Sequence, residues 1–140
     1  MDNYALHSII NKIPSLKFKY LGSYDADSFM THMPNNTFQI VNTEGRNSPG
    51  RHWVMLAKSN NMLFYGDSMG RPLARYTNIA QRRKFGGEHR DVQVMNKYKI
   101  QQGPLCGLYC IYFALQLFNN YTNVCNDYDL LRILTPYLYN

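Results

Sequence analysis

Apolar residues near the start of the chain follow a helical spacing. Those at positions 6, 9, 10 and 13 recur every three or four residues, which predicts an N-terminal helix that packs by one face. Asp2 or Asn3 can cap this helix, and Pro14 lies just past its end.

Two apolar runs in the middle of the chain predict a β-hairpin. They cover residues 52–58 and 62–66, and only the polar residues 59–61 separate them. His52 opens the first strand and Asp67 follows the second, and these outer ends of a hairpin lie side by side. The pattern therefore predicts an imidazole beside a carboxylate.

A third pattern places a cysteine at the start of a buried helix. Gly103 and Pro104 interrupt regular structure, and residues 107–118 are almost entirely apolar. Cys106 therefore lies at a helix N-terminus, where unpaired N–H groups favour the thiolate over the thiol. The alternative is that Cys106 is a small apolar core residue, as free cysteines often are.

The remaining segments are predicted from turn residues and shorter periodic patterns. The expected elements are a turn over residues 21–25, a loop over 25–36, a strand over 37–42, a basic amphipathic helix over 71–84, a strand over 92–100 and a short helix that starts at Asn126 or Asp127 and stops at Pro136.

Composition limits the classes of protein that the chain can represent. One domain over residues 1–140 is expected from the length, and 45% hydrophobic content is typical of a globular protein. No apolar run approaches the roughly 20 residues of a membrane span, so no membrane partner is expected. Three cysteines form no disulfide framework, which indicates a reducing compartment.

These positions supply the groups that a cysteine protease needs. Cys106 would attack the substrate, His52 would act as general base and acid, and Asp67 would orient the imidazole. The backbone N–H of Cys106 and the side-chain amide of Gln101 or Gln102 would stabilise the oxyanion. Taken singly, each residue also fits a surface histidine, a capped turn or a solvated glutamine.

Four blocks of the chain, in order, resemble the adenovirus endopeptidase (adenain) family within the clan of ubiquitin-like-protein-specific proteases. They are residues 20–25, residues 40–53 with the His-Trp pair, residues 64–70 with Asp67 where adenovirus enzymes have Glu, and residues 102–110. Compact relatives encoded by virophages and large mobile DNA elements look like a better match than adenovirus itself.

The resemblance implies a fold and an activity. The fold would be α+β and papain-like, with a small antiparallel sheet packed on a central helix that carries Cys106. The activity would be that of a viral cysteine endopeptidase, which cleaves capsid or precursor proteins during virion maturation and prefers small P1 and P2 residues such as glycine. The protein would then be located in the virion and the infected host cell, in a viral factory or the nucleus.

The chain departs from the family pattern at three points. Gln101 and Gln102 lie closer to Cys106 than the family pattern has its glutamine, so the sequence does not decide between them. The chain also stops soon after the last predicted helix. Finally, no cysteine lies between His52 and Cys106, so a covalently linked activating peptide is not expected there. Trp53 would bind substrate beside His52, either as part of the core or as a lid over the imidazole.

Much of the formal net charge of +6 is concentrated in one stretch. Such a stretch is typical of binding to a polyanion. The resemblance adds viral DNA as a stimulating partner, whereas no metal or other cofactor is expected. The alternative is a solvated helix face. The residues concerned are Arg71, Arg75, Arg82, Arg83, Lys84 and Arg90.

Two other functions fit the same residues. One is a deubiquitinase or deSUMOylase-like isopeptidase, because modifiers of that type also end in Gly-Gly. The other is a DNA-binding structural protein in which the catalytic residues are vestigial.

Overall fold

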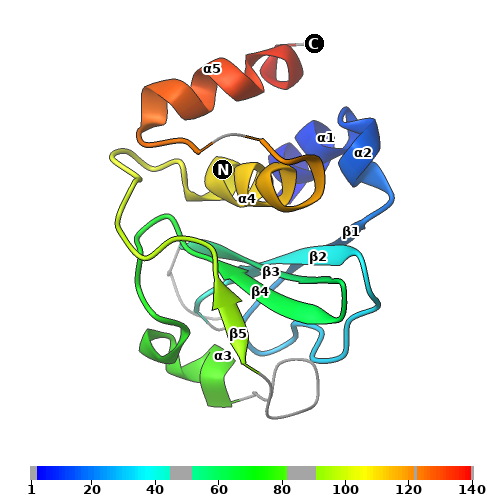
Figure 1. Ribbon diagram of the computed structural model, residues 1–140, viewed down its shortest axis with the longest axis vertical. Helices are drawn as coiled ribbons and strands as arrows, with labels where there is room; N and C mark the ends of the chain where they lie inside the picture. Colours follow the sequence, from blue (N-terminus) through cyan, green and yellow to red (C-terminus); the bar gives the residue numbers. More distant parts are fainter. Residues whose placement is uncertain (1–2, 45–51, 82–90, 122, 140) are drawn as a thin grey trace.

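A five-stranded mixed sheet forms the centre of the computed structural model, which describes residues 3–44, 52–81, 91–121 and 123–139 (Figure 1). The three central strands are antiparallel, whereas each outer strand runs parallel to its neighbour. The predicted α+β class is therefore confirmed, with a mixed rather than a purely antiparallel sheet. In spatial order the strands are β1 (Tyr20–Tyr24), β2 (Thr37–Asn42), β3 (Trp53–Ser59), β4 (Met62–Gly66) and β5 (Val92–Val94).

The predicted hairpin is formed by β3 and β4. Ser59 pairs with Met62, so the connection is the two residues Asn60 and Asn61 rather than the three expected. Their φ angles are 53° and 61°, and asparagine tolerates this left-handed conformation better than most residues.

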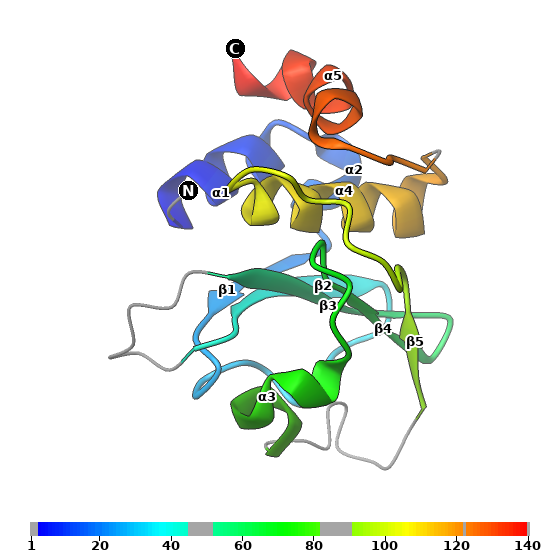
Figure 2. The ribbon, with the colours of Figure 1, turned by 90° about the vertical axis from the view of Figure 1, so that its left-hand side faces the viewer.

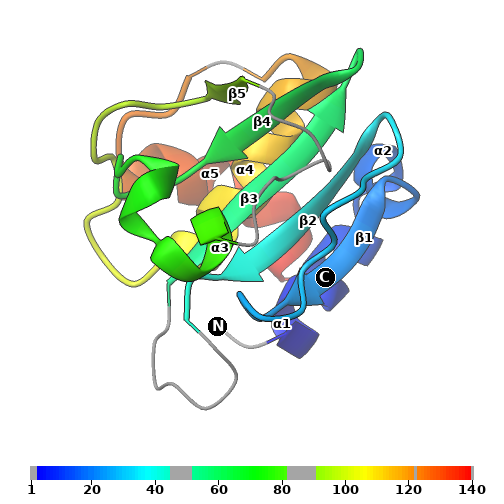
Figure 3. The same ribbon diagram turned by 90° about the horizontal axis from the view of Figure 1, so that it is seen from below.

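Helices cover the sheet on both faces. The helix α4 (Cys106–Asn119) packs on β3, and α1 (Asn3–Asn11) and α2 (Pro14–Lys17) lie beside it. The last helix, α5 (Asp127–Leu138), lies on the side of α4 that faces away from the sheet (Figure 2). The short α3 (Thr77–Gln81) lies across the opposite face of the sheet (Figure 3). Because both faces are covered, four consecutive residues of β3 are buried: Val54, Met55, Leu56 and Ala57.

The predictions for two segments, a turn over residues 21–25 and a strand over residues 92–100, are wrong in whole or in part. The segment predicted as a turn over residues 21–25 is mostly the strand β1, and the glycine that suggested a turn, Gly22, has a φ of +124° where the register of β1 on β2 shifts. The strand predicted over residues 92–100 ends at Val94. The chain then leaves the sheet edge, because the side-chain amide of Asn96 hydrogen-bonds to the backbone of Asp67.

Two predicted helices have different bounds. The helix predicted over 71–84 is split into a 3-10 turn, Leu73–Arg75, and α3, with Tyr76 between them in a non-helical conformation. Positions 82–84 lie outside the described residues. Pro136 does not stop α5, which continues to Leu138. Pro136 and Arg132, four residues earlier, are both exposed, so water can replace the hydrogen bond that proline cannot make.

No helix in the described segments is long and apolar enough to span a bilayer.

Candidate active site

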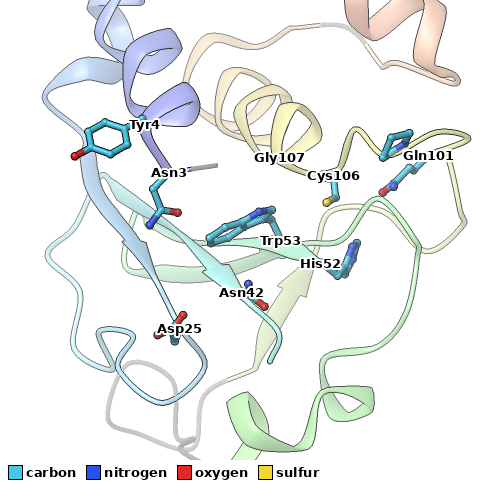
Figure 4. Close-up of a pocket in the computed structure, with 10 residues that line it drawn as sticks. Asn3, Tyr4, Asp25, Asn42, His52, Trp53, Gln101, Cys106 and Gly107 are labelled. Carbon is cyan, nitrogen blue, oxygen red and sulfur yellow. The ribbon is translucent and has the colours of Figure 1, made fainter. Parts of the chain in front are cut away.

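Cys106 is the first residue of α4 and lines a surface pocket (Figure 4). The turn containing Gly103 and Pro104 leads into α4, as the sequence predicts. From Gly107 to Leu115 every residue of the helix is buried, so packing fixes the helix while its first residue stays at the pocket. Cys106 itself is 8% exposed.

His52 and Asp67 meet at the outer end of the hairpin. The distance from His52 Nε2 to Asp67 Oδ1 is 2.5 Å, and the Asp67 side chain is fully buried. The same imidazole hydrogen-bonds to the Cys106 thiol. The three groups predicted from separate segments are therefore brought together in one chain of hydrogen bonds.

The Asp67 carboxylate is held by four further donors. The N–H groups of Met69 and Arg71 donate to it at 2.9 and 3.2 Å, and the Tyr76 hydroxyl donates at 2.7 Å. The Tyr65 hydroxyl shares its one proton between Asp67 at 3.2 Å and Arg71 O at 2.7 Å. Both backbone donors come from the turn that follows Asp67, so this turn forms around the carboxylate.

The two tyrosines were missed by the sequence analysis. Tyr65 could have been found, because it lies two residues before Asp67 on β4 and so points to the same side of the strand. Tyr76 gave no such signal. Its ring lies 5.8 Å from the His52 ring, centroid to centroid, and covers the imidazole on the side of α3.

The electrostatics of this chain of groups favour a charged pair. Burial lowers the pKa of His52, but hydrogen bonds to Asp67 and Cys106 outweigh burial and raise it to about 9. Burial raises the pKa of Cys106, but the His52 ring and the backbone N–H groups of Trp53 and Gly107 outweigh it and lower that pKa below its ordinary value. Both shifts favour a thiolate beside an imidazolium over a neutral pair.

The same contacts keep Asp67 ionised. Burial raises the pKa of its carboxyl, but the hydrogen bond and charge of His52, with the Tyr76 hydroxyl, outweigh burial and lower it.

Gln101 and Gln102 point in different directions. Gln101 lines the pocket with Cys106. Its amide oxygen accepts from the Ser68 hydroxyl at 2.5 Å, and its amide nitrogen donates to Gly103 O at 2.6 Å. Gln102 is exposed, and its amide oxygen accepts from the backbone N–H of Asp127. Only Gln101 is therefore placed to reach a group bound at Cys106.

Trp53 also lines the pocket. Its half-buried indole packs against the core and lies to the side of Cys106, on the way to Asn3 (Figure 4). It is therefore a wall of the pocket rather than a lid over the imidazole. Its backbone N–H donates to the Cys106 sulfur, a role that side-chain patterns do not reveal.

The basic stretch is described only in part. Arg71 and Arg75 are exposed beside the 3-10 turn, whereas Arg82, Arg83, Lys84 and Arg90 lie outside the described residues. Within the described part of the chain, no three His, Cys, Asp or Glu side chains gather in a way that could hold a metal ion.

The chain can be compared with a protease of known structure. The chain is similar to the ASFV pS273R protease, with 16% sequence identity and a TM-score of 0.49, over 74% of this chain and 44% of that chain. The chain thus spans less than half the length of that protease. No protein-family model and no curated protein sequence matches the chain.

Proposed function

We propose that the protein is a cysteine endopeptidase in which Cys106 is the nucleophile. His52 is the general base and acid, Asp67 orients the imidazole, and Gln101 donates to the oxyanion. The observation that carries this proposal is the continuous hydrogen-bonded chain from Asp67 through His52 to Cys106, at the edge of a pocket and with a lowered thiol pKa.

Acylation follows from this arrangement. The Cys106 thiolate attacks the scissile carbonyl carbon, and the carbonyl oxygen gains a negative charge. The Gln101 amide and the backbone N–H of Cys106 are the donors for that charge. As the tetrahedral intermediate collapses, the His52 imidazolium gives its proton to the leaving amine, and a thioester to Cys106 remains.

Deacylation uses the same groups in reverse. His52, now neutral, takes a proton from a water molecule that attacks the thioester, and the same donors stabilise the second oxyanion. The Cys106 sulfur leaves and takes back its place beside the imidazolium. Asp67 keeps the ring in one orientation throughout, because its other four hydrogen bonds do not depend on the proton of His52.

The proposal is tested by cleavage and by thiol reactivity. The full chain should cleave a fluorogenic peptide with glycine at P1 and P2, and Cys106→Ala should abolish cleavage while the matched variant of an exposed thiol, Cys125→Ala, should not. Iodoacetamide should alkylate Cys106 well below pH 8 and faster than Cys125. If Cys106 reacts no faster than Cys125, the nucleophile assignment is wrong.

The substrate class is proposed from the four blocks that resemble the adenovirus endopeptidase family. On that basis the substrates are viral capsid or precursor proteins, cleaved in the virion or the infected cell without a covalently linked activating peptide. Incubation with candidate virion precursors and, in parallel, with a ubiquitin-like fusion ending in Gly-Gly separates this function from an isopeptidase. Cleavage of the fusion alone would favour the isopeptidase.

DNA is proposed as a partner because of the concentrated positive charge. Arg71 and Arg75, the described members of the stretch, are exposed. Changing Arg82 and Arg83 to Glu should weaken DNA binding and flatten its salt dependence, since each phosphate contact adds about 0.9 to the slope for duplex DNA. An unchanged salt slope would contradict the proposal and leave a solvated face.

A further inference from the structure

The turn that carries Gln101 is tied to the C-terminal helix by one carboxylate. Asp127, the first residue of α5, accepts from the backbone N–H of Gln102 at 3.1 Å and from that of Gly103 at 2.6 Å. In return, the backbone N–H of Asp127 donates to the side-chain oxygen of Gln102 at 3.0 Å. Three hydrogen bonds therefore join two segments that lie 24 to 25 residues apart.

The Asp127 carboxylate is not needed to cap its own helix. Asn126 is the N-cap of α5, and its side chain accepts from the N–H of Asp129. The carboxylate instead turns toward the loop. There it also accepts from the buried Tyr109 hydroxyl of α4 at 2.7 Å, whose one proton is shared with Ile100 O at 3.0 Å.

The fit between carboxylate and turn is close. A Cβ atom at Gly103 would lie 3.3 Å from Asp127 Oδ2, which is tighter than most contacts of this type. The carbonyl of the same glycine accepts from the Gln101 amide nitrogen at 2.6 Å. Asp127 thus holds the N–H side of the glycine whose carbonyl group contacts the Gln101 side chain.

We infer that Asp127 is a positioning residue for the oxyanion donor Gln101, so that α5 takes part in the catalytic geometry without touching substrate. This inference rests on the proposed function. An oxyanion donor acts only if it meets the oxygen as charge develops, and a misplacement of about 1 Å can cost about 10²-fold in rate. The nucleophile is held independently, by His52 and the N–H of Trp53.

The test compares two variants of neighbouring acids on α5 in the full chain. Asp127→Asn keeps the shape but presents an amide to one of the two N–H groups. It should lower kcat about 10- to 100-fold with KM changed less than about twofold, a split that follows if the lost interaction forms only in the transition state. Asp129→Asn removes the same charge two residues further along α5 and should leave kcat unchanged.

Two further measurements separate positioning from a general loss of structure. The alkylation rate of Cys106 by iodoacetamide should be the same in Asp127→Asn and in the unmodified protein, because the thiolate pair does not involve α5. Asp127→Glu retains the carboxylate and should recover most of kcat. A parallel fall in alkylation and kcat would mean that the whole site is disturbed, and would overturn the inference.

The two ways of failing are distinct. If the unmodified protein shows no Cys106-dependent cleavage, the proposed function is wrong and the inference falls with it. If cleavage depends on Cys106 but Asp127→Asn retains kcat within about twofold, only the inference is wrong.

Discussion

Replacing Asp67 by Asn tests the electrostatic basis of the proposed site. The substitution keeps the shape of the side chain but removes the charge that, together with the hydrogen bond, holds His52 protonated. The pKa of His52 is about 9, against an ordinary value of about 6.5. A difference of that size corresponds to about 3 kcal/mol in favour of the imidazolium. Without Asp67, burial remains and Cys106 is the only strong partner, so the pKa should fall toward its ordinary value or below it.

The expected loss can be worked out at pH 7.5. A pKa of about 9 leaves about 97% of His52 protonated, whereas a pKa of about 6.5 leaves about 9%. The population of the thiolate and imidazolium pair should therefore fall about tenfold. The free energy of unfolding should also fall as the pH rises. The contribution of His52 to it is complete below about pH 6.5 and is lost as the pH rises through about 9.

The assay is the pH dependence of peptide cleavage, because turnover needs the imidazolium as general acid whereas alkylation of Cys106 needs only the thiolate. In the unmodified protein the imidazolium should be lost only near pH 9, so turnover should fall there. Asp67→Asn should move that alkaline limit down by about 2.5 pH units. Asp91→Asn is the control, since this exposed acid lies at the opposite end of the β4 and β5 pair. An unchanged pH profile in Asp67→Asn would refute the assignment of Asp67.

Three further substitutions test single contacts. Ser68→Ala removes the hydroxyl that donates to Gln101 and should lower kcat roughly tenfold. This loss is smaller than the factor of about 10² or more that removal of an oxyanion donor costs, because Gln101 itself remains. An unchanged kcat would contradict this role of Ser68. Gly66→Ala would place a Cβ 2.5 Å from Phe113 Cδ2, and should lower the free energy of unfolding by about 1–3 kcal/mol, measured by urea denaturation. Asn126→Ala should cost about 1 kcal/mol in the same assay, whereas Asn126→Asp, which keeps a capping oxygen, should not.

Local patterns were sufficient to predict the main parts of the site. The hairpin follows from two apolar runs and a short polar connection, and a hairpin necessarily brings its outer ends together, so His52 and Asp67 could be paired from sequence alone. Likewise, the start of α4 at Cys106 follows from the turn residues before it and the apolar run after it.

Contacts between distant segments could not be predicted in this way. The choice between Gln101 and Gln102 depends on Ser68 for one and on Asp127 for the other, and no periodicity links those positions. Tyr76 lies in a stretch whose apolar residues have helical spacing, yet the backbone leaves the helical conformation there and its hydroxyl reaches the carboxylate of Asp67. Here tertiary hydrogen bonds override the local pattern.

The end of β4 determines how the groups of the proposed site are spaced. The Asp67 side chain orients the imidazole, and the hydroxyl and carbonyl of Ser68 hold the side chain and backbone of the glutamine that would bind the oxyanion. His52 and Gln101 are thus held by two adjacent residues, whereas the thiol of Cys106 comes from a different element, α4. The distance between the two elements depends on Gly66, because Phe113 of α4 occupies the space where a side chain at that position would lie. The absence of one side chain therefore allows α4, which carries Cys106, to pack closely on the end of β4.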